Sequence, residues 1–288
     1  PFPCAGRQTG NLGNKEPLAI KWLFCYNYEK GGEWMEHTED VRIVPDADTA
    51  VLFLHGICGT PNHFRDLIPL VDLVPEDWSV YNVRLDGHGG SVDDFARTSM
   101  KKWRTQVFGI FDELCKNHQR VIIAGHSMGN LFAIQMAVQR PDKVPFLFLI
   151  SVPMRPWTRL FGIKNLLKLA FDKLNDEIPL EYATRRVAGI HVTRQLWKYP
   201  LWIPRFLELF QEIYRTEKKI PSLRTDAIAW QSRKDELVSN FSAGVLRKTG
   251  KFDVRELTDS THFYYTPEDQ ETVRADFRKR IEIWKKQD

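Results

Sequence analysis

The sequence predicts an α/β fold with a mostly parallel central sheet, helices on both faces of the sheet, and an inserted helical cap. Short apolar runs alternate along the chain with segments of helical periodicity, the pattern of strands joined by crossover helices. This alternation stops between Pro153 and Leu223, a stretch too long for a simple crossover. Apolar residues make up 43% of the 288 residues, enough for a sizeable core.

Four regions follow from this organisation. Residues 1–40 begin with an irregular, Gly- and Asn-containing stretch, and we expect them to form an N-terminal extension. The core is expected over residues 41–152 and 224–288, and the helical cap over residues 153–223. The chain begins with Pro1 rather than methionine, which leaves room for further natural sequence before it.

Five short apolar runs predict buried strands, and a sixth run is a weaker candidate. Their length and apolar content suit strands that are covered on both faces. In chain order they are Val51–Leu54, Val80–Val83, Val121–Ala124, Phe146–Ile150 and Ala227–Trp230, followed by the weaker Val254–Leu257.

Helices are predicted where large apolar residues recur at helical spacing. Met100–His118 places five of them on one face, and Ser99 is a suitable N-cap for this helix. A second helix is expected over Asn130–Gln139, because a proline follows it closely. In the cap, the same periodicity predicts helices over Leu160–Leu174 and Arg205–Tyr214, and no run there predicts a strand.

The pentapeptide Gly125-His126-Ser127-Met128-Gly129 lies between a predicted strand and a predicted helix, and it matches the G-x-S-x-G nucleophile elbow. A sharp turn from strand to helix forces its corner residue into strained geometry, and the flanking glycines leave space for it. The turn lifts the serine clear of the sheet and directs the free N–H groups of the helix start toward its target. Ser127 is therefore the candidate nucleophile.

A serine hydroxyl needs a base and an orienting acid, which follow the elbow in the order acid, then histidine. Asp235 lies in the loop after the strand Ala227–Trp230, and His262 in the loop after Val254–Leu257. Both loops lie at carboxyl ends of strands, where open α/β sheets place their chemistry. We predict Asp235 as the acid and His262 as the base.

Three other carboxylates compete for the role of the acid. Glu236 follows Asp235 directly but projects differently from the same loop. Asp259 is more typical of a turn, and Asp226 precedes its strand instead of following it.

Other histidines compete for the role of the base. His88 precedes the serine, and we interpret it as a loop residue near the site. His126 is adjacent to Ser127, but its side chain should point in a different direction. The remaining histidines are expected at the surface or in loops: His37, His63, His118 and His191.

The segment LFLHGICGT, residues 52–60, offers donors for an oxyanion. His55-Gly56 follows a predicted strand, and the next loop can turn a backbone N–H inward. Together with the N–H of Met128, the N–H of Ile57 would make an oxyanion hole with two donors. On its own, His55-Gly56 is more typical of an ordinary βα turn, and only the elbow shifts the interpretation toward a site.

Five segments of the chain, taken in order, resemble the α/β-hydrolase fold and, more narrowly, bacterial carboxylesterases and monoacylglycerol lipases, also catalogued with serine aminopeptidase-like hydrolases. They are FLHGICGTPNHF, YNVRLDGHGGS, AGHSMGN, WQSRKDELVS and TDSTHFYY. The resemblance covers most of residues 50–285 and implies hydrolysis of carboxylic esters through an acyl-enzyme, without a cofactor. It implies these roles: Ser127 as nucleophile, Asp235 as acid, His262 as base, and Ile57 and Met128 as oxyanion donors.

Two other functions stay open at this point. The first is an amidase or peptidase with the same triad. The second is a hydrolase-fold protein that binds a small molecule without turning it over, although the intact triad and oxyanion elements argue against it.

Composition narrows the classes of partner. The net charge of +4 is too weak to imply nucleic acid, and no apolar stretch is long enough for a transmembrane segment. The four cysteines form no C-x-x-C pair and the eight histidines show no metal-binding spacing, so we expect free thiols, no bound metal and a cytoplasmic location. The expected partner is a small-molecule ester or an acyl-lipid substrate, and no feature predicts an oligomeric state.

The cap carries an uneven share of the charge. Residues 153–223 contain 13 Lys and Arg residues against 7 Asp and Glu residues, a net of +6, which leaves the rest of the chain near −2. Solvated helix faces explain this most simply. The alternative is a basic, partly apolar lid that attracts anionic substrates or makes transient contact with an anionic membrane surface.

Overall fold

The structure, a computed structural model, describes residues 37–156, 167–171 and 173–286. The chain divides into two compact units, residues 1–35 and 36–288, and only the second is described below. The expected N-terminal extension therefore lies almost entirely outside the described residues.

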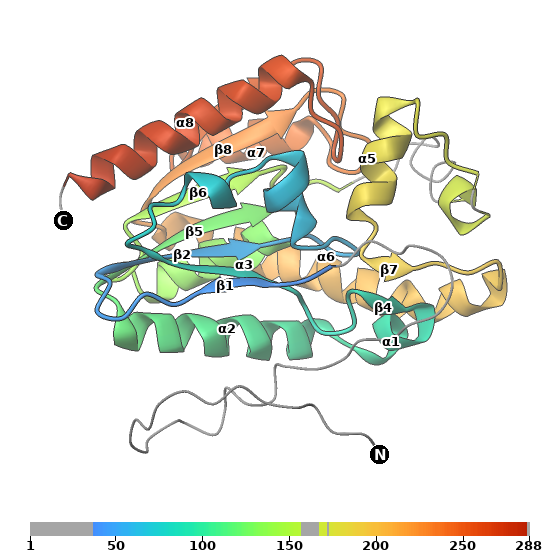
Figure 1. The fold of residues 1–288 in the computed structure, drawn as a ribbon, viewed down its shortest axis with the longest axis horizontal. Helices are drawn as coiled ribbons and strands as arrows, with labels where there is room; N and C mark the ends of the chain where they lie inside the picture. The colour runs from blue at the N-terminus through green and yellow to red at the C-terminus, as the bar shows by residue number, and fades with distance from the viewer. Residues whose placement is uncertain (1–36, 157–166, 172, 287–288) are drawn as a thin grey trace, which may run out of the picture. The chain divides into compact units, whose positions relative to one another are not determined.

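A seven-stranded sheet forms the centre of the second unit (Figure 1). The strand order is β1-β3-β2-β5-β6-β8-β9, with β1 antiparallel to β3 and every other neighbouring pair parallel. Its strands are β1 (Asp40–Arg42), β2 (Thr49–Leu54), β3 (Ser79–Val83), β5 (Arg120–His126), β6 (Phe146–Ile150), β8 (Asp226–Ser232) and β9 (Asp253–Leu257). A separate two-stranded sheet joins β4 (Gly90–Ser91) to β7 (Ile190–His191).

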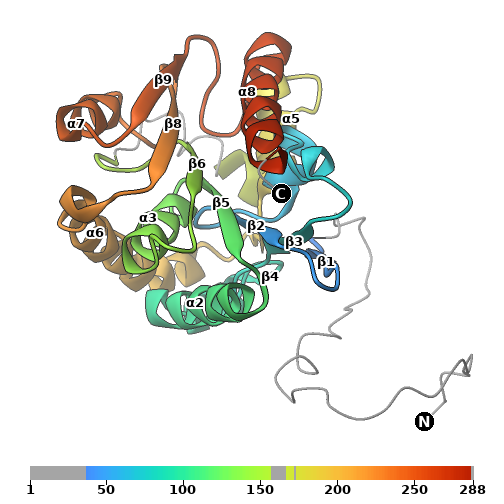
Figure 2. The ribbon, with the colours of Figure 1, turned by 90° about the vertical axis from the view of Figure 1, so that its left-hand side faces the viewer.

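Helices cover both faces of the sheet (Figure 2). On one face, α2, α3, α6 and α7 contribute buried side chains to one apolar core, and on the other face α8 contributes to a second. The helices are α1 (Val92–Arg97), α2 (Met100–Asn117), α3 (Gly129–Gln139), α5 (Pro179–Val187), α6 (Ile203–Glu217), α7 (Phe241–Thr249) and α8 (Pro267–Lys285). Shorter turns are η2 (His63–Leu67), η3 (Val71–Leu73), η4 (Leu196–Trp202) and η5 (Ile220–Ser222).

Each central strand contributes to both cores, because successive side chains of a strand point to opposite faces. In β2, Leu52 and Leu54 belong to the core of α2 and α3. Val51 and Phe53 belong to the other core, where the Phe53 ring lies 6.2 Å from that of Phe277 in α8. This burial on both faces explains why the strands are continuous apolar runs rather than alternating ones.

All six predicted strands are confirmed, with ends that shift by no more than two residues. The predicted helix at Met100 is also confirmed, and the Ser99 side chain accepts the Lys102 N–H at its N-terminus. Seven strands and helices are not among the predictions: β1, β4, β7, α1, α5, α7 and α8. The edge strand β1 is short and partly exposed, and α8 buries only the narrow stripe Val273, Phe277 and Ile281.

The region predicted as the cap is not purely helical. The expectation that it holds no strand is wrong, because β7 pairs with β4; two residues are too few to leave an apolar pattern. Helix α6 confirms the predicted helix Arg205–Tyr214 and extends it at both ends. Of the predicted helix Leu160–Leu174, residues 160–166 and 172 lie outside the described residues, and residues 167–170 are helical.

Helix α6 also belongs to the layer of helices beside the sheet. Its side chains Leu209 and Ile213 are buried in the same core as α2 and α3. The division into core and cap at residues 153 and 223 stays a prediction.

Two expectations from composition concern thiols and membranes. Cys58 and Cys115 are free thiols, whereas Cys4 and Cys25 lie outside the described residues. Within the described ranges, no helix combines the length and apolar content that a bilayer crossing requires. The same ranges hold no cluster of three His, Cys, Asp or Glu side chains suited to a metal ion.

Candidate active site

Ser127 occupies the corner between strand β5 and helix α3. The strand ends at His126 and the helix begins at Gly129, so two residues make the turn. The Ser127 backbone has a φ of 51°, in the left-handed region, where a residue with a side chain is strained by about 1–3 kcal/mol. Its N–H donates to Ile150 O at 3.0 Å, which anchors the strained corner to β6. The turn therefore has the strand–turn–helix context of a nucleophile elbow.

The close approach of helix α3 to the sheet requires glycine at positions 125 and 129 of the elbow. A Cβ atom at Gly129 would lie 2.0 Å from the carbonyl oxygen of Leu54 in β2. A Cβ atom at Gly125 would lie 2.6 Å from the side chain of Asn130. Helix α3 can therefore pack this close to the sheet only without side chains at these positions.

We expect Gly129→Ala to lower the free energy of unfolding by about 3 kcal/mol, because the Leu54 carbonyl is backbone and cannot move aside. Gly109→Ala is a matched control inside α2, where an added Cβ meets nothing within 4 Å. Helix propensity predicts a gain of about 0.5–1 kcal/mol for the control. Urea unfolding followed by circular dichroism measures both variants. Equal stabilities would contradict the close approach.

His262 and Asp235 meet in a buried hydrogen bond. They follow β9 and β8, which are adjacent parallel strands, so both loops lie at the same edge of the sheet. His262 Nδ1 lies 2.9 Å from Asp235 Oδ2, and both side chains are buried. Asp235 Oδ1 accepts the N–H groups of Leu237 and Val238, at 2.8 Å and 2.7 Å, which fixes the carboxylate. The structure thus brings the predicted acid and base together.

The residue before Ser127 in the chain, His126, contacts this pair. The ring of His126 has its centroid 4.7 Å from that of His262, and His126 Nε2 lies 3.2 Å from the His262 carbonyl oxygen. Among the described residues, no hydrogen bond joins Ser127 Oγ to the His262 imidazole. Such bonds are often long in the free enzyme and tighten in the reacting complex. The chain neighbour of the serine therefore contacts His262, while the serine itself is not bonded to the imidazole.

Electrostatics around His262 favour a base. Burial alone lowers the pKa of His262, but the charge and hydrogen bond of Asp235, with the charge of Glu236, outweigh burial and raise that pKa above its ordinary value. The same two carboxylates stabilise the imidazolium that forms when the histidine takes a proton. The surroundings of the ring thus support proton transfer to it.

Glu236 binds the backbone of the same histidine. Its Oε2 accepts the His262 N–H at 2.9 Å, and the side chain is buried. Burial raises the pKa of Glu236. From the sequence, Glu236 is only a rival to Asp235. The sequence does not reveal that these two successive carboxylates both bind His262. Asp235 binds its ring, and Glu236 binds its backbone N–H from 26 positions away.

The turn after β2 passes directly against the serine. A Cβ atom at Gly56 would lie 2.8 Å from Ser127 Cβ and 3.3 Å from its Oγ. In the same turn, the Cys58 N–H donates to His88 Nε2 at 3.1 Å. His88 is thus a loop residue near the site, as predicted, and it helps to hold this turn in place.

The N–H groups of Ile57 and Met128 belong to the two turns that meet at Ser127. Met128 stands at the N-terminal end of α3, where the first N–H groups of a helix have no partner within it. Among the described residues, neither N–H donates a hydrogen bond to another group. Their predicted role as oxyanion donors is compatible with this, and it stays a prediction.

Three histidines expected at the surface or in loops are buried: His37, His63 and His118. The ring of His63 stacks on His126 with centroids 3.6 Å apart. Burial lowers the pKa of His63 and of His126, and it lowers that of His37 to about 4, so the rings of His37, His63 and His126 are neutral near pH 7. His37 and His118 do lie in loops, as expected, although they are buried. The expectation is wrong for His63, which is buried within η2, because a neutral imidazole packs inside a protein much as other aromatic rings do.

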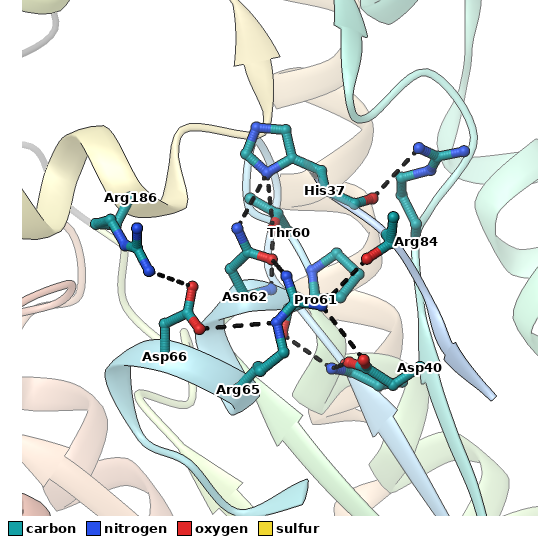
Figure 3. Close-up of polar contacts among 11 residues, drawn as sticks. His37, Asp40, Thr60, Pro61, Asn62, Arg65, Asp66, Arg84 and Arg186 are labelled. Atoms are coloured by element: carbon teal, nitrogen blue, oxygen red, sulfur yellow. Dashed lines mark hydrogen bonds and ion pairs between the residues drawn. The ribbon is translucent and has the colours of Figure 1, made fainter. Parts of the chain in front are cut away.

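A polar network holds the segment after the turn that follows β2 (Figure 3). His37 Nδ1 lies 3.2 Å from Thr60 Oγ1, and Arg186 of α5 pairs with Asp66 at 2.9 Å. Arg65 lies between the two contacts and bonds residues on both sides. The labelled members are His37, Asp40, Thr60, Pro61, Asn62, Arg65, Asp66, Arg84 and Arg186. The network ties helix α5 to the loop that carries Ile57.

A sequence model of the alpha/beta hydrolase family matches residues 51–275. The chain belongs to this family. That result confirms the resemblance found from the five segments. Residues 51–275 include the elbow and both loops that carry the acid and the base.

Curated relatives of this chain include two lipases. It is 32% identical over 93 residues to the thermostable monoacylglycerol lipase of Bacillus sp. (strain H-257), which covers 32% of this chain and 36% of that protein. It is 29% identical over 154 residues to the sn-1-specific diacylglycerol lipase ABHD11 of Mus musculus, covering 50% and 48%. The chain thus spans at most about half the length of these relatives.

Solved structures share the fold. One comes from work on the metagenome-derived lipolytic enzymes LipS and LipT, with a TM-score of 0.63 and 19% identity, covering 84% of this chain and 98% of the other. At 19% identity, this structural similarity shows that the chain has the same fold, and the reaction it catalyses depends on the residues of its own site.

Proposed function

We propose that this hydrolase is a serine esterase that cleaves carboxylic esters, with Ser127 as nucleophile, His262 as base and Asp235 as acid. Two observations carry the proposal: the buried 2.9 Å hydrogen bond between His262 and Asp235, and the strained left-handed turn at Ser127, whose chain neighbour His126 contacts the His262 ring. The lipase relatives support acyl lipids as the class of ester.

The acylation step uses both turns around the serine. His262 takes the Ser127 proton at Nε2 while Oγ attacks the carbonyl carbon of the ester. The N–H groups of Ile57 and Met128 then donate to the negative oxygen of the tetrahedral intermediate. His262 returns its proton to the alcohol oxygen as the carbon–oxygen bond breaks, which leaves the acyl group on Ser127.

Deacylation repeats this sequence with water. His262 deprotonates the water that attacks the acyl carbon, and it returns the proton to Ser127 Oγ as the acid leaves. Asp235 keeps the Nδ1 proton of the imidazole in place throughout both steps. Apart from the ester itself, every group in the scheme belongs to the chain or to water.

Matched substrates test the reaction class. We expect a p-nitrophenyl ester to be hydrolysed with a higher kcat/KM than the p-nitroanilide of the same acyl group. A preference for the anilide would indicate an amidase or peptidase with the same triad. Turnover of neither substrate, with Ser127 unreactive toward a fluorophosphonate, would indicate a protein that binds a small molecule without hydrolysing it.

We expect Glu236→Gln to move the acid limb of the kcat/KM profile to lower pH. Activity needs unprotonated His262, so it is lost as pH falls through the pKa of that group. The Glu236 charge helps to raise this pKa, and glutamine removes the charge while its carbonyl can still accept the His262 N–H. The nearby His126 and His63 have pKa values lowered by burial, and they add no charge to the shift.

A pH series on the wild type, Glu236→Gln and the exposed-site control Glu113→Gln measures the effect. The control should keep the wild-type limb. An unchanged limb in Glu236→Gln, or one displaced to higher pH, would contradict the electrostatic role of this carboxylate.

A further inference from the structure

Helix α6 and the turn η4 before it expose a row of large apolar side chains. Ile203, Leu207, Phe210 and Tyr214 follow one another along α6 at intervals of three or four, so they lie on one face. Each of them is more than half exposed, and Trp197 of η4 is 73% exposed. Soluble monomers rarely present so many neighbouring apolar side chains to water without a binding role. We call these five residues the α6 face.

The α6 face is not needed to hold the helix in the fold. The opposite side of the helix buries Leu209 and Ile213 beside α2 and α3. On that side, Glu212 is also buried, accepts from Gln135 of α3 at 2.7 Å, and pairs with Arg104 of α2. Figure 2 shows α6 beside α3, on the side of the sheet that α2 and α7 also cover. The apolar row therefore needs an explanation beyond packing within this layer.

Positive charge lies at both ends of the row. Residues 194–219 contain six Lys and Arg residues and three glutamates. Each glutamate is bound to an arginine: Glu208 to Arg205, Glu212 to Arg215, and Glu217 to Arg155. In the described part of the chain, Arg194, Lys218 and Lys219 have no carboxylate partner. Lys218 Nζ lies 4.2 Å from the centre of the Tyr214 ring, so this charge adjoins the apolar row.

We propose that the α6 face docks this protein on an anionic phospholipid surface. An amphipathic helix lying in the membrane plane inserts its apolar face at the boundary of headgroups and acyl chains. Lysine and arginine at its edges then meet the lipid phosphates. Trp197 and Tyr214 stand near the two ends of the row, and tryptophan and tyrosine are enriched at membrane interfaces. The inference does not depend on the chemistry proposed for Ser127.

A second copy of the chain fits this face less well. In a two-fold pairing with antiparallel α6 helices, Arg194 of each copy would approach Lys218 and Lys219 of the other. The glutamates nearby are already engaged, so these charges would repel each other. Anionic headgroups supply the counter-charge that a second copy lacks.

The α6 face is connected to the edge of the sheet that carries the candidate active site. In η4, the Trp202 indole donates to Val92 O at 3.0 Å, and Lys198 pairs with Asp93. Both partners belong to α1, which follows the carboxyl end of β3. Docking through this face would bring that edge of the sheet toward the lipid.

Vesicle binding tests the proposal on the full 288-residue chain. We expect sedimentation with phosphatidylserine-containing phosphatidylcholine vesicles and weaker sedimentation with phosphatidylcholine alone. The double variant Leu207→Gln, Phe210→Gln should bind about tenfold more weakly, because two inserted side chains become polar. Lys218→Gln should weaken binding about fivefold on the anionic vesicles only. Ile43→Gln is the matched control, since Ile43 and Leu207 are both 57% exposed.

Circular dichroism should be used to check that each variant is folded. Vesicle sedimentation itself needs no enzymatic activity. Three results would overturn the proposal. The first is a wild type that does not bind anionic vesicles. The second is binding that the double variant and Ile43→Gln lose equally. The third is a concentration-dependent dimer that Leu207→Gln dissociates, since it would assign the α6 face to self-association.

Discussion

Ser127→Ala should abolish ester hydrolysis, with kcat about 10⁵–10⁶-fold lower, while the protein keeps its fold. The substitution removes the hydroxyl that would carry the acyl group, and nothing else at the elbow can replace it. Stability should change little, because the Ser127 side chain makes no hydrogen bond among the described residues. Serine and alanine at position 127 also adopt the backbone φ of 51° with similar strain. Steady-state hydrolysis of a p-nitrophenyl ester and a thermal unfolding curve measure the two effects.

Ser151 provides a matched control for this variant. It is also a buried serine with a left-handed backbone, with a φ of 54°, and it follows the neighbouring strand β6. Ser151→Ala should retain activity. Full activity in Ser127→Ala, or loss of activity in Ser151→Ala alone, would show that the nucleophile has been assigned to the wrong residue.

Asp235→Asn should lower kcat by about 10⁴-fold. The asparagine oxygen can still accept the N–H groups of Leu237 and Val238, so the loop keeps its geometry. Its amide nitrogen would face His262 Nδ1, which must then be unprotonated to accept a hydrogen bond. That tautomer carries its proton on Nε2 and cannot take the proton of Ser127.

Asp259→Asn tests whether the effect is specific to this carboxylate. Asp259 lies in the same region, is exposed, and pairs with Lys234 at 2.7 Å. Its replacement should leave kcat unchanged, with both variants assayed on one ester at one pH. A large loss in Asp259→Asn with a small loss in Asp235→Asn would exchange the roles of the two residues.

Much of the fold is encoded locally and can therefore be predicted. The apolar run Phe146–Ile150 matches the bounds of strand β6, because both faces of this strand are buried. The edge strand β1 has an exposed valine between two charged residues, so it leaves no such run. The strand β7 is shorter still, and only its pairing with β4 defines it.

The site divides in the same way. The elbow around Ser127 can be recognised because strand, turn and helix follow one another in the sequence. Asp235 and His262 follow from chain order and strand ends. The bond from Glu236 to the His262 backbone, and the stacking of His63 on His126, depend on how loops distant in sequence pack together. No local sequence pattern predicts either of these contacts.

The same limit applies to helix α6. Periodicity predicts a helix over Arg205–Tyr214, but it cannot tell which apolar residues turn inward. In the structure Leu209 and Ile213 face the core, while Leu207 and Phe210 face solvent. Only the packing of α6 against α2 and α3 reveals the exposed row.

A crystal structure of the protein after reaction with a fluorophosphonate tests the central claim most directly. We expect phosphorus bonded to Ser127 Oγ, with one phosphoryl oxygen about 2.7–3.1 Å from the nitrogens of both Ile57 and Met128. The His262 imidazole should lie within hydrogen-bonding distance of Oγ and keep its bond to Asp235. An adduct on another residue, or an imidazole directed away from Ser127, would contradict the account.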